Sequence, residues 1–200
     1  MIRVRAALAA LALVAAAPAA AAAQSPADVA RFLGGAAAGF GIHEGGHLLF
    51  DTIFDADPEL RAVSFGPFPF FAIAPTRPLS PRELYVVASA GLWTHAVASE
   101  VILERHPDLR HEHAPLVKGM LAFDTLTSVG YAMAAFAKAG PPERDTLGMA
   151  TGLGVDERAI GALVLAPAVL DAYRYYHPDS TWARWLTRGI EIGSVALVLK

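Results

Sequence analysis

Three long apolar stretches, each opened by residues that favour a helix start, dominate the chain. Residues 25–54 begin with Ser-Pro-Ala-Asp, in which a capping serine precedes a proline at the first helical position and an acid at the third. Residues 80–102 begin with Ser-Pro-Arg-Glu, a capping box. Residues 115–138 end before a glycine and two prolines. The pattern predicts three long helices, the third of them long enough to span a bilayer.

Shorter elements fill the rest of the chain. Residues 61–75 mix aromatic and β-branched residues with Gly and Pro, which predicts one short β-hairpin between the first two long helices. Residues 141–155 indicate a short helix followed by a Gly-rich loop, and residues 156–176 a helix interrupted at Pro167. A last helix starts at residues 179–180. The predicted fold is an all-α membrane bundle of about four to five helices with one short β-hairpin insertion.

The composition favours a membrane protein. Hydrophobic residues make up 54% of the 200 residues and charged residues only 18%, against roughly 25% charged in an average soluble domain. An aromatic group flanks the last predicted turn, as in the belt that marks a bilayer surface: Tyr173, Tyr175, Tyr176, Trp182 and Trp185. We therefore expect about four membrane spans in contact with the lipid bilayer. The formal net charge of -3 provides no basic face, which argues against a nucleic-acid partner.

The N-terminal residues 1–23 have the pattern of a secretory signal peptide. Arg3 and Arg5 supply a positive start, residues 6–17 an apolar stretch, and three alanines a cleavage site before Gln24. An uncleaved anchor helix is the alternative, although the apolar stretch is shorter than the ~20 residues that a spanning helix needs. We expect signal-directed export, a single helical membrane domain over residues 24–200, and a multi-pass location in a bacterial-type inner membrane.

The motif H-E-x-x-H occurs once, at residues 43–47 of the first long helix. Two histidines four residues apart lie on one helical face and can bind a single zinc ion. Glu44 then lies close enough to act as the base that activates a zinc-bound water. Since the chain has no cysteine, any other ligand must be His, Asp or Glu. The imidazoles of His43 and His47 should converge on a point that faces the third long helix.

Small residues one turn before the motif should allow another helix to approach. Residues 35–39 read Gly-Ala-Ala-Ala-Gly, a small-xxx-small face. The third zinc ligand must come from elsewhere in the chain, and Asp124, an isolated carboxylate in the middle of the third long helix, is the leading candidate. Asp51 is one alternative because it follows His47 by another helical turn. Glu100 is a second, if the site resembles that of soluble zincins.

These motifs resemble the site-2 protease family of intramembrane zinc metalloproteases. Residues 43–47 match its H-E-x-G-H motif, and residues 123–125 match its later L-D-G motif at the aspartate. Residues 64–68, Ser-Phe-Gly-Pro-Phe, are similar to its Phe-Gly-Pro hairpin, and residues 90–95 resemble its A-G-P-x-x-N stretch. The resemblance covers about residues 30–135 and implies that His43, His47 and Asp124 bind zinc.

The chain departs from the family pattern at three positions. Leu92 stands where the family has proline, and Thr125 where it has glycine. His95 stands where the family has an asparagine beside the zinc. His95 could donate a hydrogen bond to an oxyanion as that amide would, serve as a fourth ligand in a closed structural site, or bond a backbone carbonyl in the bundle.

The resulting hypothesis is a zinc-dependent intramembrane or membrane-associated endopeptidase. Zinc held by His43, His47 and Asp124 would activate water, and Glu44 would take the proton. The substrate would be a membrane protein or peptide with an unwound segment. The alternative is a non-catalytic membrane protein that uses the same residues as a structural or sensory metal site, and a metal-free helical assembly factor is a third possibility.

Overall fold

The computed structural model describes residues 25–65 and 68–197, which form six helices and one two-stranded hairpin. The elements in chain order are α2 (Pro26–Ile53), β1 (Pro58–Phe65), β2 (Phe68–Pro75), α3 (Pro81–Arg105), α4 (Pro115–Ala137), α5 (Asp145–Leu153), α6 (Glu157–Tyr176) and α7 (Thr181–Ala196). The mostly helical architecture and the hairpin between the first two long helices are confirmed. The expected signal segment, residues 1–23, lies outside the described residues.

Helix starts follow the capping residues in the sequence. The Ser25 hydroxyl accepts a hydrogen bond from the backbone N–H of Asp28 at 3.2 Å, which opens α2. At the start of α3, Ser80 and Glu83 form a reciprocal capping box with distances of 2.8 and 3.3 Å. The predicted interruption at Pro167 is absent, because α6 continues through this proline. The described chain has six helices, the expected short α5 among them, rather than four or five.

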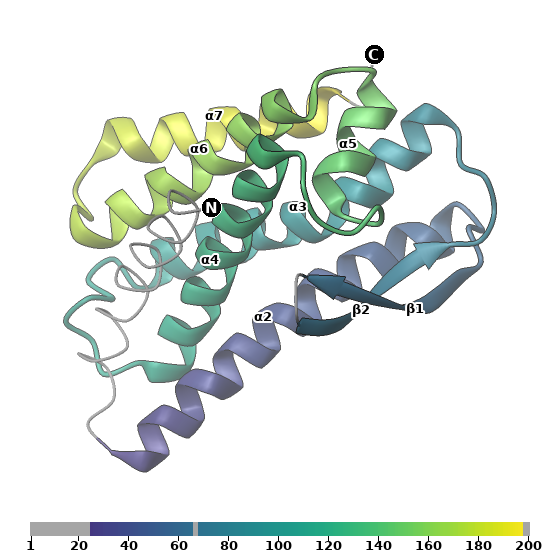
Figure 1. Cartoon of the computed structure of the whole chain (residues 1–200). Helices are drawn as coiled ribbons and strands as arrows, with labels where there is room; N and C mark the ends of the chain where they lie inside the picture. Colours follow the sequence, from purple (N-terminus) through teal and green to yellow (C-terminus); the bar gives the residue numbers. More distant parts are fainter. Residues whose placement is uncertain (1–24, 66–67, 198–200) are drawn as a thin grey trace.

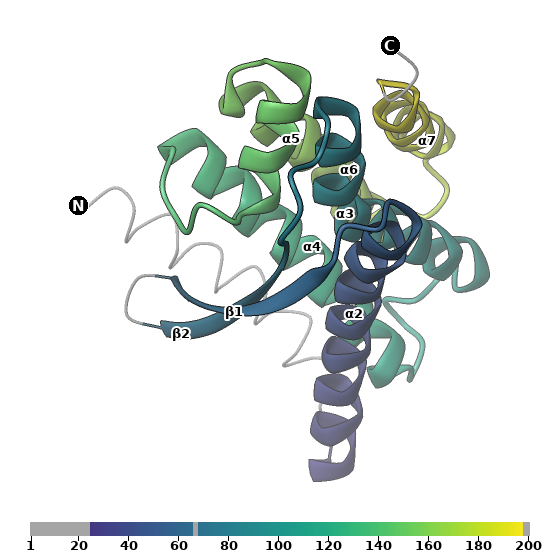
Figure 2. The same ribbon diagram turned by 90° about the vertical axis from the view of Figure 1, so that its right-hand side faces the viewer.

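The hairpin connects α2 to α3 and lies outside the helices (Figure 2). Its strands pair antiparallel, with Pro58 opposite Pro75 at the base and Phe65 opposite Phe68 at the tip. Ala56, just before β1, is fully buried and its carbonyl accepts from the backbone N–H of Thr76 at 3.2 Å. The base of the hairpin is therefore tied to the end of α2, while its strands run along the bundle.

Backbone contact joins α2 to α4 at glycines. A Cβ atom added to Gly35 would lie 1.9 Å from the carbonyl oxygen of Leu116, and one added to Gly119 would lie 1.9 Å from that of Phe32. Gly39 meets the ring of Phe123, where an added Cβ would come within 2.9 Å. The small-residue face at residues 35–39 is thus the face against which α4 packs, and no side chain larger than hydrogen fits there.

α3 runs through the middle of the bundle, between α2 and the layer formed by α6 and α7 (Figure 1). Its buried side chains build the main apolar cluster with those of α5 and α6: Tyr85, Ala88, Leu92, Met149, Ala150, Ile160 and Val164. The Tyr85 hydroxyl donates to the backbone carbonyl of Ser194 at 2.8 Å and so ties α7 to this core. α3 is therefore the element that joins α2 to the layer formed by α6 and α7.

Among the described residues, α3 and α4 are the helices that are long and apolar enough to cross a membrane. This finding concerns length and composition, and half of the apolar window of α3 is buried inside the protein. A buried core helix of a soluble protein would meet the same criterion. The two helices fall short of the four spans expected from the sequence.

Replacement of Gly35 by alanine should destabilise the protein, because the added methyl group would overlap the backbone of α4. Overpacking of this kind typically lowers the free energy of unfolding by about 1–3 kcal/mol. Gly34→Ala is the matched control, since an added Cβ there meets nothing within 4 Å and should raise stability by roughly 0.5–1 kcal/mol through helix propensity. Unfolding of both variants, followed by circular dichroism under identical conditions, makes the comparison. Equal stability of the two variants would show that α2 and α4 are not in backbone contact.

Candidate metal centre

His43, His47 and Asp145 form a buried group that could hold a metal ion. The Nε2 atoms of the two histidines lie 3.2 Å apart. Asp145 Oδ2 lies 3.3 Å from His43 Nε2 and 3.4 Å from His47 Nε2. A tetrahedral zinc ion with bonds of about 2.0–2.1 Å holds its ligand atoms roughly 3.3–3.4 Å apart. The triangle of ligand atoms therefore has the dimensions that such an ion requires.

The carboxylate of Asp145 is buried beside the two imidazoles. Asp145 Oδ2 is inaccessible to solvent and lies 3.3 and 3.4 Å from the Nε2 atoms of His43 and His47. A buried carboxylate needs a proton donor or a cation beside it. A cation shared by the three side chains fits this position.

α2 and α3 fix the two histidines. His47 Nδ1 lies 2.8 Å from the carbonyl oxygen of Val87, to which it donates, so its Nε2 lone pair points toward the group. Gly91 of α3 lies directly against both rings: an added Cβ would be 2.5 Å from His43 Cε1 and 2.6 Å from His47 Nε2. Gly46 allows this approach, since a Cβ there would lie 2.7 Å from the carbonyl oxygen of Ala90. The backbone of α3 thus forms one wall of the group.

Asp145 is held by its two chain neighbours. Arg144 pairs with the carboxylate of Glu157 through two hydrogen bonds of 2.7 Å each, and Thr146 donates to the same carboxylate at 2.9 Å. Glu157 is buried at the start of α6. Bidentate arginine pairs of this type restrict orientation as well as distance. Asp145, between the two residues that bind Glu157, is therefore fixed relative to α6.

Electrostatic interactions link the members of the group. Burial opposes ionisation of Asp145, but the neighbouring imidazoles of His47 and His43 hold the pKa of its carboxyl well below its usual range. Burial also opposes the charged form of His47, yet the Asp145 carboxylate raises the pKa of that imidazole to about 9. A cation bound by the three side chains would favour the ionised form of the Asp145 carboxyl in the same way.

A cavity of about 300 Å³ opens beside the group. Glu44 lines it together with His43, His47 and Asp145, while the opposite walls come from the hairpin, α4 and the segment before α5. Burial raises the pKa of Glu44 above its ordinary value, against the lowering effect of His43 and His47. A carboxylate with a raised pKa is a better proton acceptor at neutral pH. Glu44 therefore borders the same cavity as the His43, His47 and Asp145 group, with a carboxyl whose pKa is raised.

Asp124, expected as the third ligand, does not belong to this group. Its Oδ2 accepts from the hydroxyl of Ser99 at 3.2 Å, and its Oδ1 lies 3.6 Å from His95 Nε2. Asp124 lies apart from the two histidines of the motif because of the orientation of α4 about its own axis. Gly119 and Phe123 face α2, so the following residue, about 100° further round the helix, is directed toward α3. The structure places Asp145 against the two histidines instead.

The two other acids considered from the sequence also lie outside the group. Asp51 is fully buried, and neither of its carboxylate oxygens makes a hydrogen bond within residues 25–65 and 68–197. Glu100 is engaged elsewhere, at 2.6 Å from Arg174 and in a further ion pair with Arg188. In sequence, Asp145 stands out only as an acid at the start of a short helix after two prolines. No motif connects it to the histidines.

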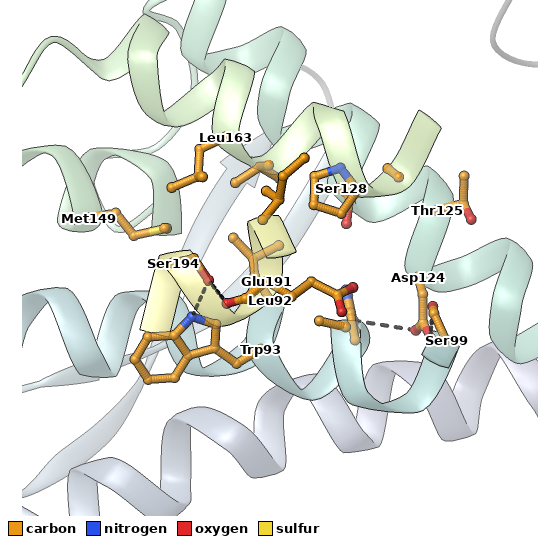
Figure 3. Close-up of a pocket in the computed structure, with 16 residues that line it drawn as sticks. Leu92, Trp93, Ser99, Asp124, Thr125, Ser128, Met149, Leu163, Glu191 and Ser194 are labelled. Carbon is orange, nitrogen blue, oxygen red and sulfur yellow. Dashed lines mark hydrogen bonds and ion pairs between the residues drawn. The ribbon is translucent and has the colours of Figure 1, made fainter. Parts of the chain in front are cut away.

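His95 lies behind His43 rather than beside the cavity that Glu44 lines. Its Nε2 is 3.2 Å from His43 Nδ1, on the side of that ring opposite Nε2. His95 borders a different and smaller cavity of about 60 Å³, shown in Figure 3 with Ser99 and Asp124 at one end and Glu191 directed into it. In this position His95 contacts His43 from behind but supplies no atom to the group and does not line the cavity beside Glu44.

Comparison of the chain with protein-family models, curated proteins and solved structures gives no match in any of the three. The similarity to site-2 proteases therefore depends on the residues of the motifs alone.

Replacement of Asp145 by asparagine should weaken metal binding much more than the same change at Asp124. Loss of a ligating carboxylate should lower zinc affinity by more than the 10- to 100-fold that changes in outer contacts typically cause, so we expect a loss above about 100-fold. Competition of each purified variant with a zinc-binding dye measures the affinity. A larger loss for Asp124→Asn would place the third ligand on α4 instead.

Gly91→Ala should also lower zinc affinity, because the added methyl group would force both imidazoles out of position. Gly45→Ala is the matched control in the same region, where an added Cβ meets nothing within 4 Å. We expect at least a tenfold loss for Gly91→Ala, comparable to disturbing the outer contacts of a ligand, and no loss for Gly45→Ala. The same dye competition checks this. Unchanged affinity in Gly91→Ala would mean that the metal does not bind between these rings.

Proposed function

We propose that this chain is a zinc metalloprotease, an endopeptidase that acts on membrane proteins or peptides. The observation that carries the proposal is the His43, His47 and Asp145 triangle at the edge of a cavity that Glu44 also lines. Zinc bound there would lower the pKa of a water molecule and polarise a peptide carbonyl. Glu44 would take the proton from that water and later give it to the leaving amine.

The number of protein ligands favours a catalytic site over a structural one. Structural zinc sites usually have four protein ligands, whereas catalytic sites have three and leave one position for water or substrate. Of the residues that might have supplied a fourth ligand, His95 contacts the far side of His43 and Asp51 lies outside the group. The cavity that Glu44 lines together with the three side chains would give water and substrate access to such a metal, which supports hydrolysis.

Apolar surfaces support a membrane location. α3 and α4 have the length and composition of spanning helices. Large apolar side chains are also exposed on α2 and α7, among them Leu33, Leu49, Ile53, Trp185 and Ile192. Contact with lipid would remove these side chains from water. We propose a multi-pass protein of a bacterial-type inner membrane. The cavity beside Glu44 is lined by Val63, Ile73 and Phe123, and these apolar side chains suit an apolar segment of substrate.

Replacement of Glu44 by glutamine should abolish peptide hydrolysis without loss of zinc. General-base catalysis contributes roughly 10²- to 10⁴-fold, so the rate should fall by at least 100-fold. Cleavage of a fluorogenic peptide library and of a single-span model protein, both in detergent, measures the rate. Zinc content is measured in the same samples.

Chelator-treated protein and Asp145→Asn serve as controls, and both should lose hydrolysis together with zinc. Equal cleavage by Glu44→Gln and the unaltered protein, with zinc bound in both, would contradict the protease. Stoichiometric zinc with no cleavage by any form would instead indicate the structural or sensory metal site.

A further inference from the structure

His95 is buried next to the metal group but supplies none of its ligand atoms. Its Nε2 atom lies 3.2 Å from His43 Nδ1. Asp124 Oδ1, at 3.6 Å from the same Nε2, is beyond hydrogen-bonding distance. Asp124 instead accepts a hydrogen bond from Ser99 through its other oxygen. His43 is therefore the hydrogen-bonding partner of His95 Nε2.

Metal binding would determine which nitrogen of His43 carries the proton. His43 Nε2 faces Asp145 and His47, so this atom would bind the metal through its lone pair. A neutral imidazole bound in this way has its proton on Nδ1, and a buried N–H needs an acceptor. His47 has such an acceptor in the carbonyl of Val87. For His43 the nearest acceptor is the ring of His95.

We propose that His95 is a positioning residue that accepts the Nδ1–H of His43 and so directs His43 Nε2 toward the metal. This inference rests on the metal site of the proposed function. It differs from the roles expected from the sequence, in which His95 contacts an oxyanion or binds the metal itself. His95 acts through His43 alone.

The surroundings of His95 agree with this arrangement of protons. If His95 Nε2 accepts from His43, its own proton is on Nδ1. His95 Nδ1 is buried and has no hydrogen-bonding partner in the described part of the chain. The cavity of about 60 Å³ that His95 borders is large enough for ordered water. Figure 3 shows Ser99, Asp124 and Glu191 among the mostly apolar side chains that line this space, and their oxygens could bind such a water.

Two substitutions separate hydrogen bonding from packing. The side chain introduced by His95→Gln would retain an acceptor at about the position of the imidazole Nε2, whereas His95→Leu fills similar space without one. Ser99→Ala, one turn further along α3, is the control because Ser99 contacts Asp124 and not His43. Zinc affinity is measured by dye competition on purified full-length protein, and thermal unfolding verifies that each variant is folded.

We expect His95→Leu to bind zinc 10- to 100-fold more weakly, the usual effect of removing an outer partner of a ligating histidine. His95→Gln should remain within a few-fold of the unaltered protein, as should Ser99→Ala. Unchanged affinity in His95→Leu would overturn the inference. An equal loss in both His95 variants would also overturn it, because packing alone would then explain the effect.

The same titration distinguishes this failure from failure of the proposed function. If the unaltered protein does not bind zinc stoichiometrically, the metal site and the role of His95 are both wrong. If it binds zinc and only the His95 variants behave otherwise than expected, the metal site stands and the role of His95 is wrong.

Discussion

A buried carboxylate facing two imidazoles is the constraint around which the rest of the structure is arranged. An isolated ionised carboxylate in an apolar interior is very unfavourable, and it is tolerated only beside positive charge or a metal ion. Asp145 meets this condition through the two imidazoles that α2 supplies. Gly91 of α3 leaves room for both rings, and Glu157 of α6 binds the two chain neighbours of Asp145. These contacts fix the three side chains relative to one another.

Local features of this protein follow from the sequence because they depend on neighbours a few residues apart. Ser25 and Ser80 begin helices through hydrogen bonds to residues three positions further on. The pairing of His43 with His47 depends on helical periodicity alone. The hairpin is likewise evident from its aromatic, β-branched and turn-forming residues. Each of these predictions involves one element and its own geometry.

The carboxylate that lies against the two histidines could not be predicted in the same way, because its identity depends on how helices pack against one another. Asp124 and Asp145 are both acids in apolar surroundings, and Asp124 has the more central position in a long helix. Which of them meets the histidines depends on the side of α4 that faces α2, and that is set by backbone contact at Gly119. The position of His95 has the same origin, since a rotation of α3 by one residue would direct it elsewhere.

The wall that Gly91 forms has a consequence for how sites of this kind can diversify. Because any side chain at Gly91 would collide with both imidazoles, substitution there cannot add a new side chain on the α3 side of the His43, His47 and Asp145 group. The opposite side is unconstrained by the ligands: Val63, Ala72 and Ile73 of the hairpin border the cavity without contributing to the metal group. Substitutions in the hairpin can therefore change the shape and polarity of this cavity without altering the His43, His47 and Asp145 group.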